Sequence, residues 1–281
     1  MKFGKFEVDV LDTGLFGLDG GAMFGVVPKT IWSKLYNHGD DLNRIPLAAR
    51  PMLIRYGDKK ILVDTGNGTK YNEKLVQIYN FDLEKGNLDY SLSKIGISRN
   101  EITDVILTHL HFDHCGDSTI VENGKIVPAF PNAKYYVQKD HYKWALNPTE
   151  KDRASFIKDN YEEIISNGMM EFVDGEGEIF PGIKLVLSNG HTKALQMVRV
   201  ESEDKSLLYC ADLSPTSAHI GYAYGLGYDN FPLTTIEEKK KYFNQAAEEN
   251  TLLVFEHDAF CEAAYIGLGE KGLFVKERIK I

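Results

Sequence analysis

Cysteine is scarce in this sequence, with three residues among 281. An odd number of thiols cannot pair completely, and Cys115, Cys210 and Cys261 lie in or beside apolar runs, so we expect reduced, mostly buried thiols. Long apolar runs are also missing, and none approaches the roughly 20 residues that span a bilayer. No charged start leads into a long apolar segment, so we expect no signal peptide and a soluble cytoplasmic protein.

A basic surplus is absent as well. The chain has 41 acidic and 32 basic residues, a formal net charge of −9. A general nucleic-acid binder would normally show a basic face for the phosphate backbone, so this class is disfavoured. No long linker, repeat or low-complexity tract interrupts the chain, and the 43% hydrophobic content supplies a large core. We therefore expect one α/β domain over residues 1–281.

Histidine is concentrated in one place. His109, His111 and His114, three of the eight histidines, stand with Asp113 within six positions. The apolar run before them predicts a short buried strand over residues 104–108. Neutral imidazoles and carboxylates are the usual protein ligands for zinc and similar metals. The segment therefore predicts a metal site at the end of a strand.

The spacing of this segment indicates two metals rather than one. In an extended segment, side chains two positions apart point the same way, so His109 and His111 can hold one metal. Asp113 and His114 follow as the chain turns away, so they can face a second. A polar loop that happens to be rich in histidine is the alternative, but chance placement at this spacing is improbable.

The pattern H-x-H-x-D-H after a strand resembles the signature of the metallo-β-lactamase superfamily. The resemblance implies an αββα sandwich, with two mixed sheets packed between helices and a dimetal site at one end. It also implies three further ligands, each behind an apolar strand-like run. These are matched, in order, by His191, Asp212 and His257.

The resemblance implies a ligand set and a reaction. The first metal is assigned His109, His111 and His191, the second Asp113, His114 and His257, and Asp212 bridges them. Two cations about 3.5–4 Å apart share a hydroxide that attacks an electrophilic carbonyl or phosphorus. Asp113 is placed to pass a proton to the leaving group. A histidine-rich set suits zinc, and Mn, Fe or Co also fit.

Residues 20–29 and 212–219, together with Tyr228-Asp229, resemble the quorum-quenching N-acyl-homoserine-lactone lactonases related to methyl parathion hydrolase. This resemblance implies a small-molecule lactone or ester substrate. The chain departs from the well-known lactonase branch at Pro215, where that branch has a tyrosine, so another group has to assist. The candidate substrate-binding residues are Phe24, His219, Tyr222 and Tyr228.

Several alternatives stay open. The apolar loop around Phe24 is either core filler or a substrate wall. The chain is alternatively a phosphotriester or aryl-ester hydrolase of the same fold, or a non-catalytic metal-binding scaffold. The family is often dimeric, so a homodimer is one expectation.

Other patterns predict the surrounding elements. A β-hairpin is expected over residues 52–64, and the resemblance places Asp64 at its end beside the site. Strands are expected at 183–188, 197–201, 207–210 and 252–256, with a polar turn at 203–205. Helices are expected at 88–96 and 150–167, and a loop at 14–25. Thr235 with Glu238 predicts a capping box that opens a helix ending near Asn250.

Overall fold

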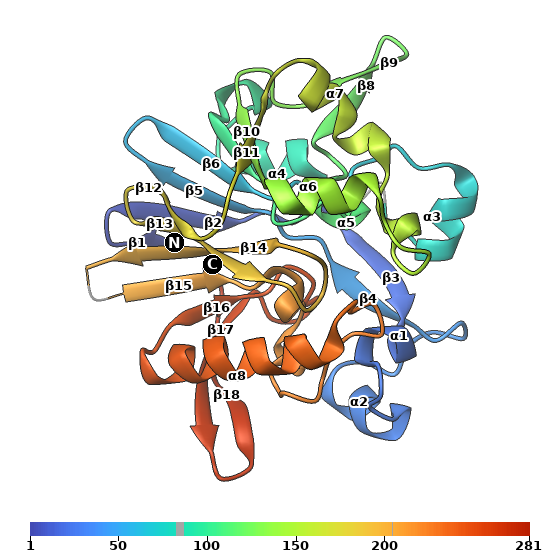
Figure 1. Ribbon diagram of the computed structural model, residues 1–281, viewed down its shortest axis with the longest axis vertical. Helices are drawn as coiled ribbons and strands as arrows, with labels where there is room; N and C mark the ends of the chain where they lie inside the picture. The colour runs from blue at the N-terminus through green and yellow to red at the C-terminus, as the bar shows by residue number, and fades with distance from the viewer. Residues whose placement is uncertain (83–86, 204) are drawn as a thin grey trace. The chain divides into compact units, whose positions relative to one another are not determined.

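A computed structural model of the protein describes residues 1–82, 87–203 and 205–281. The described residues form two compact units, each with one large mixed sheet (Figure 1). The first unit consists of Met1–Leu15 and Ala49–Gly175, and the second of Phe16–Ala48 and Glu176–Ile281. Asp204, within the turn expected at 203–205, lies outside the described residues.

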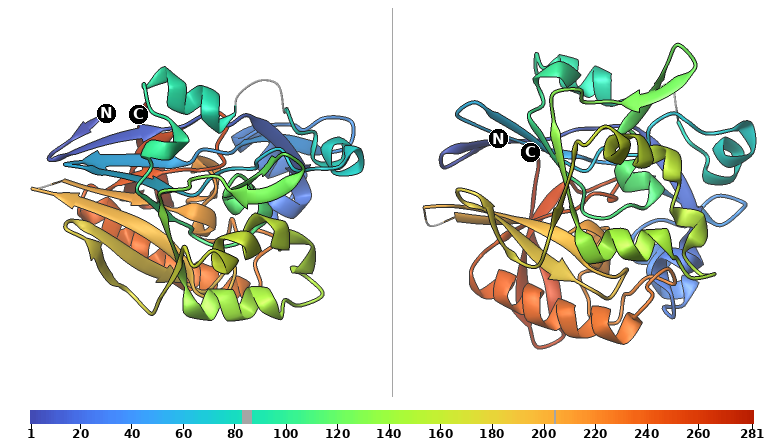
Figure 2. Two further views of the ribbon diagram at one scale, coloured as in Figure 1. Left: turned by 90° about the horizontal axis from the view of Figure 1, so that it is seen from above. Right: turned by 45° about the horizontal axis from the view of Figure 1, so that its top comes forward.

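The first unit is built on a seven-stranded sheet in the order β1-β2-β5-β6-β7-β10-β11. Its strands are β1 (Lys2–Phe3), β2 (Phe6–Val10), β5 (Met52–Tyr56), β6 (Lys59–Val63), β7 (Asp104–Ile106), β10 (Lys134–Gln138) and β11 (Met170–Val173). The strands up to β6 pair antiparallel, and β6, β7, β10 and β11 are parallel. Figure 2 shows the blue strands of this sheet side by side. The predicted hairpin over 52–64 is confirmed.

Apolar residues of the central strands form the core of this unit. All three residues of β7 are buried, and Val105 packs in a cluster with Leu62 and Tyr135 from the strands on either side. The helices of the unit are α3 (Glu73–Tyr79), α4 (Leu88–Lys94), α5 (Phe112–Cys115), α6 (Lys139–Leu146) and α7 (Glu162–Ser166). A small hairpin of β8 (Thr119–Glu122) and β9 (Lys125–Pro128) accompanies them. The helix predicted at 88–96 is confirmed as α4.

The single helix predicted at 150–167 is wrong. The segment contains two 3₁₀ turns, at Arg153–Ser155 and Lys158–Asn160, before α7 begins at Glu162. The carboxylate of Asp152 accepts hydrogen bonds from the N–H and hydroxyl of Thr149. Such local bonds compete with the helical ladder, so the chain turns here instead of continuing as a helix.

The second unit is built on a seven-stranded sheet whose strands follow sequence order from β12 to β18. They are β12 (Gly177–Phe180), β13 (Ile183–Ser188), β14 (Leu195–Ser202), β15 (Lys205–Tyr209), β16 (Leu252–Val254), β17 (Ala263–Gly269) and β18 (Gly272–Ile279). Only the β15–β16 pair is parallel among these strands. The strands predicted at 183–188, 197–201, 207–210 and 252–256 are confirmed to within two residues at each end.

Helix α8 (Pro232–Glu248) packs on the second sheet against β17 (Figure 1). The predicted capping box is wrong, because the helix begins at Pro232, which pre-sets helical φ at the first position. Thr235 therefore lies inside the helix and donates its hydroxyl proton to Asp229 Oδ2 at 3.0 Å. Glu238 accepts hydrogen bonds from the segment before His191 instead of capping the helix.

The loop predicted at 14–25 is also wrong. Its residues form β3 (Leu15–Asp19), which pairs with β4 (Arg44–Ala48), and the short helix α1 (Gly20–Phe24). Helix α2 (Lys29–Leu35) follows. The side chain of Asp19 accepts a hydrogen bond from Ala22 N at 2.8 Å, which caps α1 in spite of its glycines.

The three cysteines are free and buried, as expected. Burial raises the pKa of the Cys115 thiol to about 12, so this side chain stays a neutral core group although it follows His114. Among the described residues, no helix combines the length and the apolar character needed to span a bilayer.

Gly116 holds the histidine-rich segment against the chain that follows β6. A Cβ placed on Gly116 would lie 1.8 Å from the carbonyl oxygen of Asn67, so only glycine fits. Its φ of −60° is ordinary, so space and not backbone freedom makes the requirement. Beside it, Gly66 and Cys115 form a parallel bridge that keeps the two segments in register.

We expect Gly116→Ala to lower the free energy of unfolding by about 1–3 kcal/mol, because the added methyl must displace backbone. Gly269→Ala is the matched control, since its Cβ would meet Phe274 at an ordinary 3.5 Å. Urea denaturation of both variants and the wild type measures the effect. Equal midpoints for the two variants would contradict the argument.

Candidate metal centre

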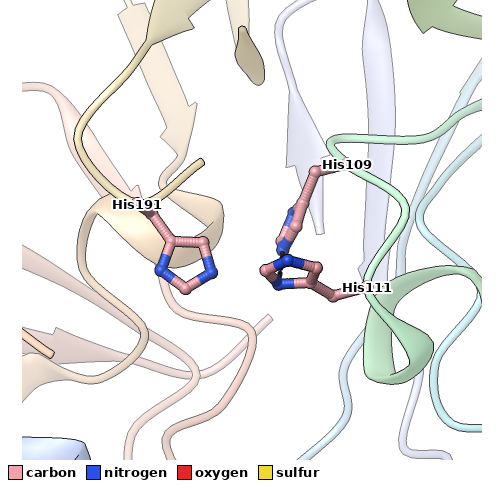
Figure 3. A group of neighbouring side chains, drawn as sticks. All are labelled: His109, His111 and His191. Atoms are coloured by element: carbon pink, nitrogen blue, oxygen red, sulfur yellow. Dashed lines mark hydrogen bonds between the residues drawn. The ribbon is translucent and has the colours of Figure 1, made fainter. Parts of the chain in front are cut away.

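The first cluster of possible ligands follows β7. Leu107 and Thr108 continue from the strand, and the imidazoles of His109 and His111 then turn toward one another (Figure 3). His109 Nε2 lies 3.1 Å from His111 Nδ1. Two ring nitrogens this close, both in a buried position, suit lone pairs that converge on a shared cation.

The backbone of Leu110, between the two histidines, is hydrogen-bonded to a third histidine. Its backbone N–H donates to His141 Nε2 at 2.8 Å, from α6. His141 is fully buried and must be neutral at Nε2 to accept this bond. It fixes the backbone between His109 and His111. Sequence alone gave no signal for this role, because the contact joins residues 31 positions apart.

Asp113 and His114 lie on α5, and their ligand atoms are within 4.8 Å of one another. His114 Nδ1 donates to Asp64 Oδ2 at 3.0 Å, which places the lone pair of the ring on Nε2. Asp64 also accepts the N–H and hydroxyl of Thr108, each at 2.7 Å. The expected position of Asp64 beside the site is therefore observed, and Thr108 is its partner.

The second unit carries a cluster of its own. His191 follows β13, Asp212 lies in a 3₁₀ turn at Ala211–Leu213 after β15, and His257 follows β16. His191 Nε2 is 3.2 Å from Asp212 Oδ2, and His257 Nε2 is 3.3 Å from Asp212 Oδ1. One carboxylate thus meets a different imidazole at each of its oxygens.

Both imidazoles of this cluster are oriented through their other nitrogen. His191 Nδ1 donates to Asp229 Oδ1 at 3.1 Å, and His257 Nδ1 donates to the carbonyl of Ala48 at 2.7 Å. These bonds place the ring proton on Nδ1 and the lone pair on Nε2, an arrangement typical of histidines that bind metal. The sequence indicates Asp229 only through the family resemblance, and nothing in the sequence indicates the role of Ala48.

The donor chemistry of each cluster fits a divalent cation. Every member is an imidazole or a carboxylate, and each is at most 7% exposed. Buried carboxylates with neutral imidazoles are costly without a partner cation, and this combination favours zinc or a related transition metal. The seven residues are His109, His111, Asp113 and His114 in the first unit and His191, Asp212 and His257 in the second.

The candidate substrate residues lie in different environments. Phe24 is fully buried and stacks on Trp32 and His219, which favours the core-filler alternative. Tyr222 is half-buried, and its hydroxyl donates to Asn244 Oδ1. Tyr228 keeps 37% of its surface exposed.

His219 is fully buried and links α1 to the segment that follows Asp212, within the second unit. Its Nε2 donates to the carbonyl of Met23 at 2.8 Å, and its Nδ1 accepts from the hydroxyl of Thr216 at 2.7 Å. A carbonyl can only accept, so a proton is on Nε2. Burial, with a smaller effect of the Lys239 ammonium, lowers the pKa of His219 to about 3.

Two α/β units that present buried imidazoles and carboxylates at the ends of their strands are characteristic of metal-dependent hydrolases. The family model described as the metallo-beta-lactamase superfamily matches residues 45–256. The chain belongs to the metallo-β-lactamase superfamily, and it has the fold of that family, with two large mixed sheets and helices.

The proteins that this chain resembles include lactonases and a probable metal-dependent hydrolase. An N-acyl homoserine lactonase of Bacillus thuringiensis is 28% identical over 220 residues, which cover 73% of this chain and 79% of the relative. A crystal structure of a probable metal-dependent hydrolase from Staphylococcus aureus has a TM-score of 0.91 at 29% identity and covers 100% of this chain and 99% of its own. AidC, a dizinc quorum-quenching lactonase, has a TM-score of 0.82 at 21% identity, with 100% and 97% covered. The chain is accordingly a metal-dependent hydrolase with lactonase homologues.

The buried His219 generates a prediction about pH. Between pH 6.5 and about 3 the unfolded chain binds a proton that the folded chain does not, so stability falls as the pH falls through this window. We expect the free energy of unfolding of the wild type to fall about 1.4 kcal/mol per pH unit more steeply than that of His219→Gln. Urea denaturation between pH 6 and 4.5, with a chelator present so that metal release does not contribute, measures the difference. Parallel pH dependences would show that His219 is not held neutral.

Proposed function

We propose that this hydrolase uses two divalent cations to cleave a lactone or ester bond. In this proposal His109, His111 and His191 would hold one cation, Asp113, His114 and His257 would hold the other, and Asp212 would be a ligand to both. Zinc is the first metal to test, because the ligand set is rich in imidazole and AidC is a dizinc enzyme.

The observation that carries the proposal is the environment of Asp212. Its two carboxylate oxygens lie 3.2 and 3.3 Å from the Nε2 atoms of His191 and His257. A carboxylate that shares one oxygen with each of two metal-binding imidazoles has the arrangement of a bridging ligand. A site with one metal would not need a different imidazole at each oxygen.

When bound, the two cations supply an activated water and polarise the carbonyl that the water attacks. The oxygen of the water adds to the carbonyl carbon, and the bond from that carbon to the leaving oxygen breaks. We propose that Asp113 takes up the proton that the attacking water loses and delivers it to this leaving oxygen, so that a lactone opens to a hydroxy acid. Asp64 and Asp229 keep His114 and His191 in the tautomers that this chemistry requires.

N-acyl homoserine lactones are the first substrate class to test. The lactonase relatives support this choice, as does the resemblance of residues 212–219 to lactonases. Pro215 stands where the well-known lactonase branch has a tyrosine, so the assisting group differs. We propose Tyr228 for substrate contact, because it is the most exposed of the four candidate residues, whereas Phe24 and His219 are buried.

Replacement of both His109 and His111 by Ala is expected to remove bound metal and hydrolysis together. The loss of metal affinity should exceed the roughly 10–100-fold that loss of an outer hydrogen-bond partner causes. His38→Ala is the matched control, because His38 is an exposed histidine outside both clusters. Elemental analysis and hydrolysis rates measure the two effects. Full activity of the double variant without metal would refute the proposal.

A substrate panel on metal-loaded protein tests the reaction itself. We expect N-acyl homoserine lactones to be opened well above background, with proton release as the readout, and aryl esters and phosphotriesters to be slower. Faster turnover of an aryl ester or a phosphotriester would contradict the proposed lactone substrate and identify that compound class as the substrate instead. Background rates for every compound, with metal bound, would favour a non-catalytic scaffold.

A further inference from the structure

The segment that leads from β13 to His191 is held by one side chain of α8. Glu238 Oε2 accepts the hydroxyl proton of Ser188 at 2.6 Å and the backbone N–H of Gly190 at 3.1 Å. Glu238 Oε1 accepts the backbone N–H of Asn189 at 2.7 Å. Hydrogen bonds to a carboxylate are about twice as strong as neutral ones, and here three converge on the residues before a proposed ligand.

The same face of α8 contacts this segment over several turns. Thr235, Glu238 and Tyr242 are spaced three and four positions apart, so they lie on one side of the helix. At Thr235 the helix comes close to Gly190, because a Cβ on Gly190 would lie 2.2 Å from Thr235 Oγ1 and 2.6 Å from Thr235 Cα. Tyr242 donates its hydroxyl proton to the carbonyl of Leu187 at 2.8 Å. The helix face therefore sets the path of the chain from Leu187 to Gly190.

The residues that lead into α8 complete the contact. Phe231 N donates to the carbonyl of Gly190 at 2.8 Å. The backbone N–H and the side-chain amide of Asn230 both donate to the carbonyl of His191 at 3.0 Å. With Asp229 on its imidazole, His191 is bounded on the backbone and the ring by residues 229–238. Within this set Glu238 is the carboxylate that accepts from the backbone of Asn189 and Gly190.

We propose that Glu238 is a positioning residue that sets the direction of the His191 imidazole toward its metal. It acts through the backbone of Asn189 and Gly190 and does not touch the metal or the substrate. The inference rests on the proposed function, in which His191 is a metal ligand. Its neighbour Glu237 offers a matched control, because that exposed carboxylate pairs only with Lys240, at 2.8 Å, among the partners observed for it.

The experiment titrates Co²⁺ and Zn²⁺ into the metal-free full-length chain, against a chromophoric chelator and by the visible spectrum of bound Co²⁺. We expect Glu238→Ala to weaken one of the two metal equivalents by about 10–100-fold and to change the Co²⁺ spectrum. Glu238→Gln keeps a carbonyl acceptor and should recover part of the affinity. Glu237→Gln should match the wild type.

A purely structural role is separated by Phe243→Leu, which removes volume from a fully buried position of the same helix. This variant should lower stability and leave metal affinity and spectrum unchanged. Wild-type affinity and spectrum in both Glu238 variants would overturn the inference while the proposed function stands. The same loss of affinity in Phe243→Leu would also overturn it. Failure of the wild type to bind either metal would overturn the proposed function and this inference with it.

Discussion

The structure depends on imidazoles that are aimed by hydrogen bonds that their Nδ1 nitrogen donates. His114 donates to Asp64, His191 to Asp229, and His257 to the carbonyl of Ala48. Each acceptor is buried, so water does not compete for the ring proton. A buried imidazole without such an acceptor could present either nitrogen, and its lone pair would have no fixed direction. Much of the chain around the two clusters serves to bring these acceptors into place.

This constraint is visible in the backbone. Asp64 adopts a left-handed conformation with φ of 56°, and Ala211, directly before Asp212, has φ of 43°. Residues with a Cβ occupy this region at a cost of about 1–3 kcal/mol. These conformations turn the chain so that the carboxylates of Asp64 and Asp212 lie where a continued extended strand would not place them. The surrounding hydrogen bonds, such as those from Thr108 to Asp64, hold the strained turn in place.

Local spacing and strand periodicity were enough to predict the strands that precede the ligands and the segment from His109 to His114. Some predictions from local patterns were wrong, and contacts between distant segments could not be predicted from the sequence. The helix expected at 150–167 is divided where Asp152 bonds to Thr149, and the supposed capping box failed because Pro232 already starts the helix. His141 and Thr108 act through contacts between segments remote in the sequence, and no pattern near them indicated a role. The pattern around Glu238 indicated a helix cap, whereas its carboxylate holds the segment before His191.

The segments that make up the two units are synthesised in an order that affects folding. The second unit combines Phe16–Ala48 with Glu176–Ile281, so its first piece leaves the ribosome long before the last. Chains generally fold domain by domain during synthesis, from the N-terminus onward. Here the stack of Phe24 on His219 cannot form until nearly two hundred further residues have emerged. All residues of the first unit have been synthesised once Gly175 is added. If this unit folds at that stage, the inserted segment Phe16–Ala48 still lacks the rest of the second unit.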